Sequence, residues 1–487
     1  MSEKTRSVTR ESLHTESTKL SGNMGVSELV MSVLAFSSPL TTVAGFIPVL
    51  LLFSGPTAPG IYILLTVMLL LFSVGFVRMS HRVQNPGGFY SFVTAGLGKP
   101  AGLGGALLAV SGYLFIGFFA PTLFALTLQG FVVSFGGPDI PWYWFALVII
   151  ATTTTLAYRR IDLSAKVLTI VMMLEVVVVI VFNVFAFTSG ASTPDQETAF
   201  SIPWFTDAGL GLALLFAVGN FFGFEATVIY REEVRDPERT IPRATYIAVV
   251  GIGVFYAIAA WAYIAFVGAG DVQAVAAENT VSLFDDTVTA LVGKVFAEIA
   301  TLLLITSILA SMLSIQNIAA RYSFSLAVDH VFPSFLGRVH RRHRSPYLAA
   351  LAVGGIWALA TIVFSILGVP PELLYPVASG SGSFAVLLLL FITSLAVLVF
   401  FLRRRRTTPE SVWKTIIAPA MSAVFLGLIT YLAIVNYPEL IGGDILLTVV
   451  FMAFTFALFF GGIVYAVYLR RKRPSVYARL GRQSVKS

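Results

Sequence analysis

The chain has 487 residues, of which 57% are hydrophobic and 12% are charged, and its formal net charge is +7. Soluble domains typically carry about 25% charged residues, whereas the mean hydropathy here is +0.86. This composition excludes an ordinary soluble protein and predicts one integral membrane domain. Cysteine is absent, which excludes disulfides, thiolate metal sites and cysteine nucleophiles.

About twelve apolar runs along the chain are long enough to cross a ~30 Å hydrocarbon core as helices. Before them, residues 1–25 are polar and lack the features of a cleaved signal peptide, so we expect a cytoplasmic tail. The first, third, eighth and tenth spans exceed a straight crossing, and we expect them to be tilted, broken or projecting. The predicted spans are residues 26–53, 58–77, 103–133, 141–156, 163–187, 208–230, 241–267, 291–319, 346–367, 374–402, 416–434 and 445–469.

The basic residues alternate with these spans. If the N-terminus is cytoplasmic, all of the 32 Lys and Arg residues except Lys294 fall in cytoplasmic segments. Because cytoplasmic loops carry the excess of Lys and Arg, the pattern predicts a multi-pass protein of the plasma or inner membrane with both termini inside. The expected organisation is the N-terminal tail, a core at 26–402, two trailing helices at 403–470 and a cytoplasmic tail at 471–487.

Two predicted spans are interrupted near their middle. In the first, Pro39 lies among serines and threonines, and proline removes a backbone donor and clashes with the preceding turn. In the sixth, Gly219 and Gly223 flank Asn220, and two glycines four residues apart weaken a helix. The positions correspond if the first ten helices form two five-helix halves, and matched interruptions in inverted halves indicate a transporter's binding site. The alternative is a proline kink and a glycine-rich packing face.

Three strings in or beside the predicted inner loops carry a family resemblance. They are Asn85-Pro86-Gly87-Gly88-Phe89-Tyr90, Gly223-Phe224-Glu225 followed by Glu232-Glu233, Asp236-Pro237 and Ile241-Pro242-Arg243-Ala244, and Asn317 with Ala320-Arg321-Tyr322 and Pro333. Together they resemble the amino acid–polyamine–organocation transporters over roughly residues 27–406.

The resemblance implies an all-α fold of the leucine-transporter type. It consists of two inverted five-helix repeats within 26–402 and two trailing helices. It also implies alternating access, with the substrate between the first and sixth helices. This chain departs from the family in the first interruption, where many relatives have a glycine-rich string and here the residues are Ser37-Ser38-Pro39-Leu40-Thr41-Thr42.

An amino acid substrate presents a carboxylate and an ammonium group, which suit the N–H and carbonyl groups freed where a helix unwinds. The serines and threonines can add hydroxyls, or they can bond the carbonyls of their own helix. Phe222 and its neighbours can wall a pocket or simply pack, and Glu225 can meet the substrate amine, take part in gating or satisfy freed backbone groups. The predicted substrate-binding residues are Ser37, Ser38, Pro39, Thr41, Thr42, Tyr113, Gly219, Asn220, Phe221, Gly223, Phe224 and Glu225.

Glu175 lies about 18 Å into the predicted fifth span, near the middle of the membrane, with apolar neighbours. A charged carboxylate is costly there, so we expect Glu175 to be a proton-coupling residue. The alternative is a structural acid that stays neutral or hydrogen-bonded. In proton-coupled relatives, an ionisable fifth-helix group, often lysine, lies where sodium-coupled relatives hold an ion. Sodium is therefore the rival ion, with Ser307, Ser311 and Ser314 as possible ligands.

An enzyme is not expected, because cysteine is absent and the five histidines fall in predicted cytoplasmic segments (His14, His81, His330, His340 and His343). We expect no metal, cofactor or nucleic acid. The expected function is proton-coupled secondary transport of an amino acid, with a polyamine or amine permease or an amino acid exchanger as alternatives. From other classes, a transporter-like nutrient sensor would bind without accumulating substrate, and a channel could not concentrate it.

Overall fold

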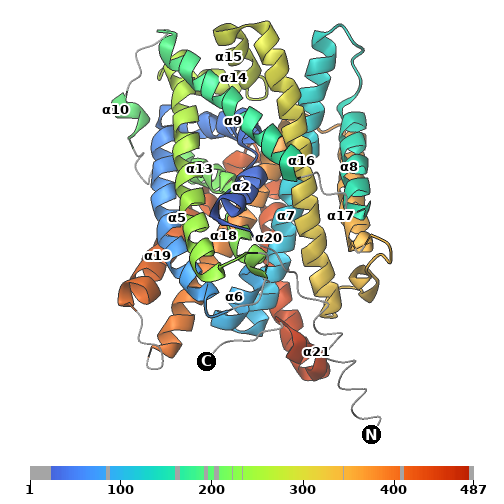
Figure 1. Cartoon of the computed structure of the whole chain (residues 1–487). Helices are drawn as coiled ribbons and strands as arrows, with labels where there is room; N and C mark the ends of the chain where they lie inside the picture. Colours follow the sequence, from blue (N-terminus) through green and yellow to red (C-terminus); the bar gives the residue numbers. More distant parts are fainter. Residues whose placement is uncertain are drawn as a thin grey trace.

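The computed structural model describes residues 24–83, 88–159, 165–190, 196–201, 208–221, 223–232, 234–343, 345–405 and 411–481. These residues form helices and no strand, and an isolated bridge pairs Met24 with Val234. The long helices run side by side as one bundle (Figure 1). Nine stretches of the described residues are long and apolar enough to cross a membrane, and one of them, Val26–Ser80, contains two predicted spans.

The first half of the bundle begins with an interrupted helix. It consists of α2 (Val26–Ser37), α3 (Pro39–Thr41), a π-helical turn (Thr42–Phe46) and α4 (Ile47–Ser54). A 3₁₀ turn (Gly55–Thr57) then leads to α5 (Ala58–Ser80), α6 (Gly88–Leu97), α7 (Lys99–Ser134), α8 (Trp142–Arg159) and α9 (Ala165–Thr188).

A second interrupted helix opens the other half. It consists of α11 (Ala208–Asn220), α12 (Ala226–Ile229) and a 3₁₀ turn (Tyr230–Glu232), and it follows the short α10 (Gln196–Ala199). The remaining helices are α13 (Pro237–Val267), α14 (Val272–Glu278), α15 (Leu283–Val292), α16 (Lys294–Val328), α17 (Tyr347–Ile366), α18 (Pro371–Arg404), α19 (Ala418–Leu440), α20 (Ile445–Lys472) and α21 (Pro474–Arg479). Two single turns, Ser334–Gly337 and Trp413–Ile417, precede α17 and α19.

The predicted spans all contain helix, with α8 at the fourth and α11 at the start of the sixth. The three long helices α7, α16 and α18 have 36, 35 and 34 residues and are continuous. The predicted start of the eighth span at residue 291 is wrong. Residues up to Val292 belong to α15, and Gly293 separates the two helices with a φ of 105°, which glycine adopts without strain.

Several short helices lie outside the predicted spans. Helices α6 and α21 lie at one end of the bundle, and α14 and α15 lie at the other end (Figure 1). With 10 residues or fewer they are too short to cross a bilayer, so the search for 20-residue apolar runs missed them.

The two interrupted helices lie next to each other in the bundle. Helix α4 contacts α11, and α2 contacts α12, so the two chains of half-helices run past each other in opposite directions. Helices α5, α7, α13, α16 and α18 surround them, and most of their side chains belong to one continuous apolar core. The fold therefore places two backbone breaks at the same depth, inside protein and away from the outer face of the bundle.

Candidate functional site

The first interruption is centred on Ser38. Its φ of 45° lies in the left-handed region, and Pro39 begins the next helical piece. A non-glycine residue in this region costs about 1–2 kcal/mol, so surrounding contacts must hold it there. The helix regains regular geometry at Ile47, after the π-helical turn. The sequence-predicted break is thus present at the predicted residues.

The second interruption extends from Asn220, the last residue of α11, to Ala226, the first residue of α12. Gly223 has a φ of 95°, and its N–H donates to Glu225 Oε2 at 3.0 Å. The carboxylate therefore satisfies a donor that the break releases from the helix. Phe222 lies outside the described residues.

Other backbone groups at the two breaks are satisfied by hydroxyl donors. Ser37 Oγ donates to the carbonyl of Asn220 at 3.2 Å, which joins one break directly to the other. Thr42 Oγ1 donates to the carbonyl of Ser37 at 2.8 Å, and Tyr263 OH of α13 donates to the carbonyl of Val43 at 3.0 Å. Without such partners, an interrupted helix inside a membrane would leave costly unpaired groups.

Two buried tyrosines that the sequence reasoning missed also contact the breaks. Tyr256 of α13 shares a hydrogen bond with Ser37 Oγ at 2.5 Å, and Asn220 Nδ2 donates to Tyr62 OH of α5 at 2.5 Å. The Oδ1 atom of Asn220 is buried and has no hydrogen-bond partner among the described residues. Burying an acceptor without a hydrogen-bond partner costs free energy, so the Oδ1 atom of Asn220 is suited to accept a hydrogen bond from a ligand.

A cavity of about 40 Å³ lies between the two breaks. It is large enough for water but much smaller than the pockets that enclose small molecules. Of the predicted site residues, it is lined by Ser37, Ser38, Thr41, Thr42, Gly219 and Ser311. Its other described lining residues are Phe46, Ile116, Phe119, Ala120 and Ile315.

Helical periodicity could have found part of this lining. Ile116 and Ala120 follow Tyr113 by three and seven residues, so all three fall on one face of α7. Ser311 and Ile315 are four residues apart and therefore also share one face of α16. Extending each predicted site residue by one or two turns would have added these apolar side chains.

Tyr113 and Glu225 form a separate polar contact, and neither is among the described residues lining the cavity. Tyr113 OH donates to Glu225 Oε1 at 3.0 Å, and the ring of Tyr113 packs on that of Tyr322, with centroids 5.6 Å apart. Glu225 therefore joins the second break to α7 and α16. Of its possible roles, this geometry favours satisfying the freed backbone and controlling the break over direct contact with a substrate in the cavity.

The remaining predicted residues face other neighbours. Phe224 packs on the rings of Phe72 and Phe76 of α5, with centroids 5.9 and 6.2 Å away. Pro39 and Phe221 are buried, but they are not among the described residues lining the cavity. These residues belong to the packing around the breaks and are not part of the described cavity lining.

Glu175 of α9 lies against the first break and is 3% exposed. Its Oε2 accepts from Ser307 Oγ at 2.8 Å and from the N–H of Leu40 at 3.4 Å. Ser307 Oγ in turn accepts from Thr41 Oγ1 at 2.9 Å. The carboxyl group is thus two hydrogen bonds away from a cavity-lining threonine.

The three serines considered as ion ligands are placed differently from one another. Ser307 contacts Glu175, whereas Ser311 Oγ and Ser314 Oγ donate to carbonyls of their own helix at 3.0 Å. Ser311 lines the cavity, and Ser314 is only half-buried. Of these three hydroxyls, only that of Ser307 donates a hydrogen bond to a carboxylate.

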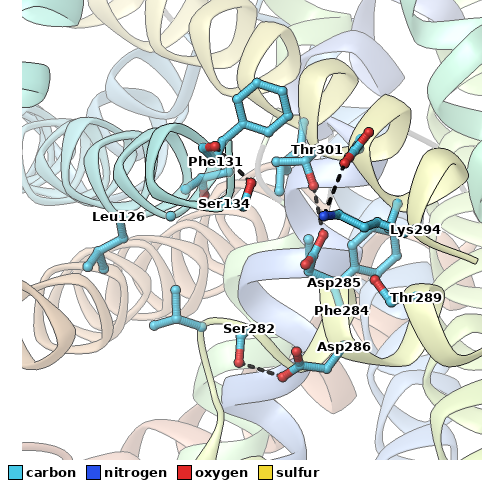
Figure 2. Close-up of a pocket in the computed structure, with 17 residues that line it drawn as sticks. Leu126, Phe131, Ser134, Ser282, Phe284, Asp285, Asp286, Thr289, Lys294 and Thr301 are labelled. Carbon is cyan, nitrogen blue, oxygen red and sulfur yellow. Dashed lines mark hydrogen bonds and ion pairs between the residues drawn. The ribbon is translucent and has the colours of Figure 1, made fainter. Parts of the chain in front are cut away.

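A second, larger cavity of about 400 Å³ lies between α7, α15 and α16. Figure 2 shows Asp285, Asp286 and Lys294 around it, and Thr301 Oγ1 donates to Asp285 Oδ1 at 2.9 Å. Lys294 pairs with Glu298 at 3.9 Å, so the lining carries more negative than positive charge. Ala44, in the π-helical turn of the first break, belongs to the lining, and the cavity therefore extends to the edge of that break.

Comparisons with known proteins agree with this architecture. The amino acid permease family matches residues 27–478. The chain is 26% identical over 348 residues to the low-affinity putrescine importer PlaP of Escherichia coli, which covers 68% of this chain and 73% of that protein. It is 25% identical to the branched-chain amino acid permease BcaP of Bacillus subtilis, over 44% of each chain. The lysine-specific permease LysP of Lactococcus lactis is also 25% identical, over 53% of this chain and 54% of its own.

The resemblance that the loop strings carry is confirmed, since the family match covers nearly all of the bundle. Members of this family are permeases, and the apolar helices are those of a multi-pass membrane protein. The protein therefore belongs to the amino acid permease family and is a membrane transporter, with two adjacent broken helices at its centre.

Proposed function

We propose that this protein carries an amino acid across the cytoplasmic membrane by alternating access, coupled to a proton. The observation that supports this most directly is the contact of the buried acid Glu175 with the first helix break. The proposal includes two inverted five-helix repeats within 26–402 and a cytoplasmic location for both termini. Ser37, Ser38, Thr41, Thr42, Gly219 and Asn220 are the residues proposed to meet the substrate.

Substrate binding at the breaks follows from what each broken end offers. The start of a helical piece presents N–H groups and suits the carboxylate, and the end of the preceding piece presents carbonyls and suits the ammonium. The present cavity is too small for an amino acid, so the described conformation is a closed one. Entry of substrate requires Ser38–Thr42 to move away from Phe119 and Gly219.

Proton coupling follows from the hydrogen-bond chain. When charged, Glu175 can only accept, and it accepts from Ser307 and from the N–H of Leu40. When protonated on Oε2, its O–H can donate to Ser307, and the Ser307 hydroxyl must then turn to another acceptor. Thr41 Oγ1, 2.9 Å from Ser307 Oγ, can serve as that acceptor, and the Thr41 hydroxyl then reorients as well. In this way a proton on Glu175 can change the bonding of a residue that lines the cavity, and this supports a link between protonation and the conformation of the first break.

The test is uptake of radiolabelled amino acids into proteoliposomes under an inward proton gradient without sodium. The parent should accumulate substrate, and Glu175→Gln should keep substrate binding but lose the drive from the gradient. Glu439→Gln, at an exposed end of α19, is the matched control and should behave like the parent. A requirement for sodium, or an unchanged pH response in Glu175→Gln, would refute Glu175 as the coupling residue. Binding without accumulation would indicate a sensor.

A polyamine is the second candidate substrate, because one of the similar proteins is a putrescine importer. The acidic cavity bordered by α15 and α16 also suits a cation on its way to the breaks. A polyamine has no carboxylate, so it would leave the freed N–H groups of the breaks unused. Competition by putrescine, with no competition by any amino acid, would favour this candidate over the first.

A further inference from the structure

The segment that follows α20 folds back onto the bundle. Leu480, just after α21, is 1% exposed and belongs to an apolar cluster separate from the main core. The other buried members of this cluster come from α6, α7, α16 and α20 and are Tyr90, Leu103, Ala106, Val110, Leu326, Ala466 and Leu469. One side chain thus fills a space where four helices meet.

Lys99, the first residue of α7, holds the same segment by its backbone. Its Nζ donates to the carbonyls of Tyr477 and Ala478 at 3.0 and 2.6 Å, and it lies 5.3 Å from the centre of the Tyr477 ring. Carbonyls at a helix end lack partners within the helix, and a lysine is a favourable partner for them. The contact therefore attaches the C-terminal end of α21 to α7.

A path of packed side chains leads from this segment to the second break through α6. A Cβ on Gly481 would lie 2.9 Å from the Cγ2 atom of Thr94 of α6, so the backbone of Gly481 packs closely against the Thr94 side chain. Phe89 of α6 packs on Phe76 at 5.8 Å, and Phe76 packs on Phe224 of the break at 6.2 Å.

A second path runs through α16. Tyr322 packs against the cluster that contains Leu480, and its ring lies against that of Tyr113. Tyr113 OH donates to Glu225. Both paths therefore end within residues 223–225, where the half-helix α12 separates from α11.

We propose that residues 474–481 form an autoinhibitory strap, which keeps α6 and the neighbouring ends of α7 and α16 in the closed arrangement and so opposes opening of the second break toward the cytoplasm. The strap rests on the proposed alternating access. It acts on the closed state, in which α12 contacts α6 and the strap contacts α6 through Leu480 and Gly481.

The experiment uses the absence of native cysteine. Val228 of α12 is fully buried, so Val228→Cys should react with a membrane-impermeant thiol reagent at the cytoplasmic face only when α12 moves. Adding Leu480→Asp or Lys99→Met should raise its labelling rate in inside-out vesicles by roughly fivefold or more. Ser475→Asp, at an exposed position of α21, adds the same charge outside the cluster and should leave the rate unchanged.

A reporter at the other end of the bundle separates release of the strap from general loosening. Ala297 lines the acidic cavity and is 3% exposed, and Ala297→Cys should label from outside no faster in the strap variants. Unchanged labelling at Val228→Cys, or a parallel rise at both reporters, would overturn the strap. Labelling does not depend on transport. If the strap variants change the labelling rate as expected but the protein accumulates no substrate, the proposed function is refuted and the strap is not.

Discussion

Gly219→Ala should disturb the contact between the second break and α18. A Cβ at this position would lie 2.2 Å from Ser383 Oγ and 3.3 Å from a ring carbon of Phe46. Ser383 is fully buried, and its Oγ has no hydrogen-bond partner in the part of the chain that the structure describes. The first distance is far below any real contact, so Ser383 Oγ must rotate away or α11 and α18 must move apart.

Overpacking of this kind costs about 1–3 kcal/mol. Ser383→Ala alone should be nearly neutral, because the hydroxyl it removes makes no hydrogen bond to any described residue. In Gly219→Ala/Ser383→Ala the nearest α18 atom becomes Ser383 Cβ at 3.4 Å, an ordinary contact. The second substitution should therefore recover about 1–2 kcal/mol of the loss, a coupling expected only for residues in contact.

The assay is the apparent melting temperature of the purified protein together with its uptake rate in proteoliposomes. The expected order is parent and Ser383→Ala highest, the double variant next, and Gly219→Ala lowest. Ser381→Ala, two residues away on the same helix and bonded to Tyr437 OH at 2.8 Å, is the matched control and should not rescue Gly219→Ala. A double variant no better than Gly219→Ala would refute the packing argument.

Two further predictions concern topology and the second break. A cysteine introduced by Asp236→Cys, in the loop after α12, should react with an impermeant reagent only from the cytoplasmic face; labelling in intact cells would contradict the proposed orientation. Tyr113→Phe removes the hydroxyl that donates to Glu225. It should lower the free energy of unfolding by about 1.5–3 kcal/mol, the range for a hydrogen bond to a charged group. The double variant Tyr113→Phe/Glu225→Gln should lose less stability and uptake than the sum of the two single variants. If the losses of the single variants simply add, the two side chains do not act together.

Both helix breaks could be predicted because their causes are local. Proline and closely spaced glycines weaken a helix locally, although α7 and α18 continue through Pro121 and Pro376, and the alternating basic loops predict the orientation of the spans. The loop strings identified the family for a similar reason, since they are short and continuous. Two parts of these strings, Asn85-Pro86-Gly87 and Glu233, lie outside the described residues.

The partners of the site residues could not be predicted, because they depend on packing between distant helices. Tyr113 and Glu225 are 112 residues apart, and Ser37 and Tyr256 are 219 apart. A phenylalanine such as Phe224 carries no signal in the sequence for facing α5 instead of the cavity. Burial of Glu175 followed from its apolar neighbours, whereas its contact with Ser307 required the fold.

The continuous length of α7, α16 and α18 has a mechanical consequence. At 1.5 Å per residue, helices of 34 to 36 residues are about 51–54 Å long, which exceeds the ~30 Å hydrocarbon core. Helix α16, which unlike α7 (Pro121) and α18 (Pro376) has no internal proline, is a stiff rod whose ends lie about 26 Å from its midpoint. A tilt of about 10° at mid-membrane would displace each end by about 4–5 Å, nearly one helical turn. A small rotation of such a helix beside the breaks therefore produces a larger displacement of its ends at the two faces of the membrane.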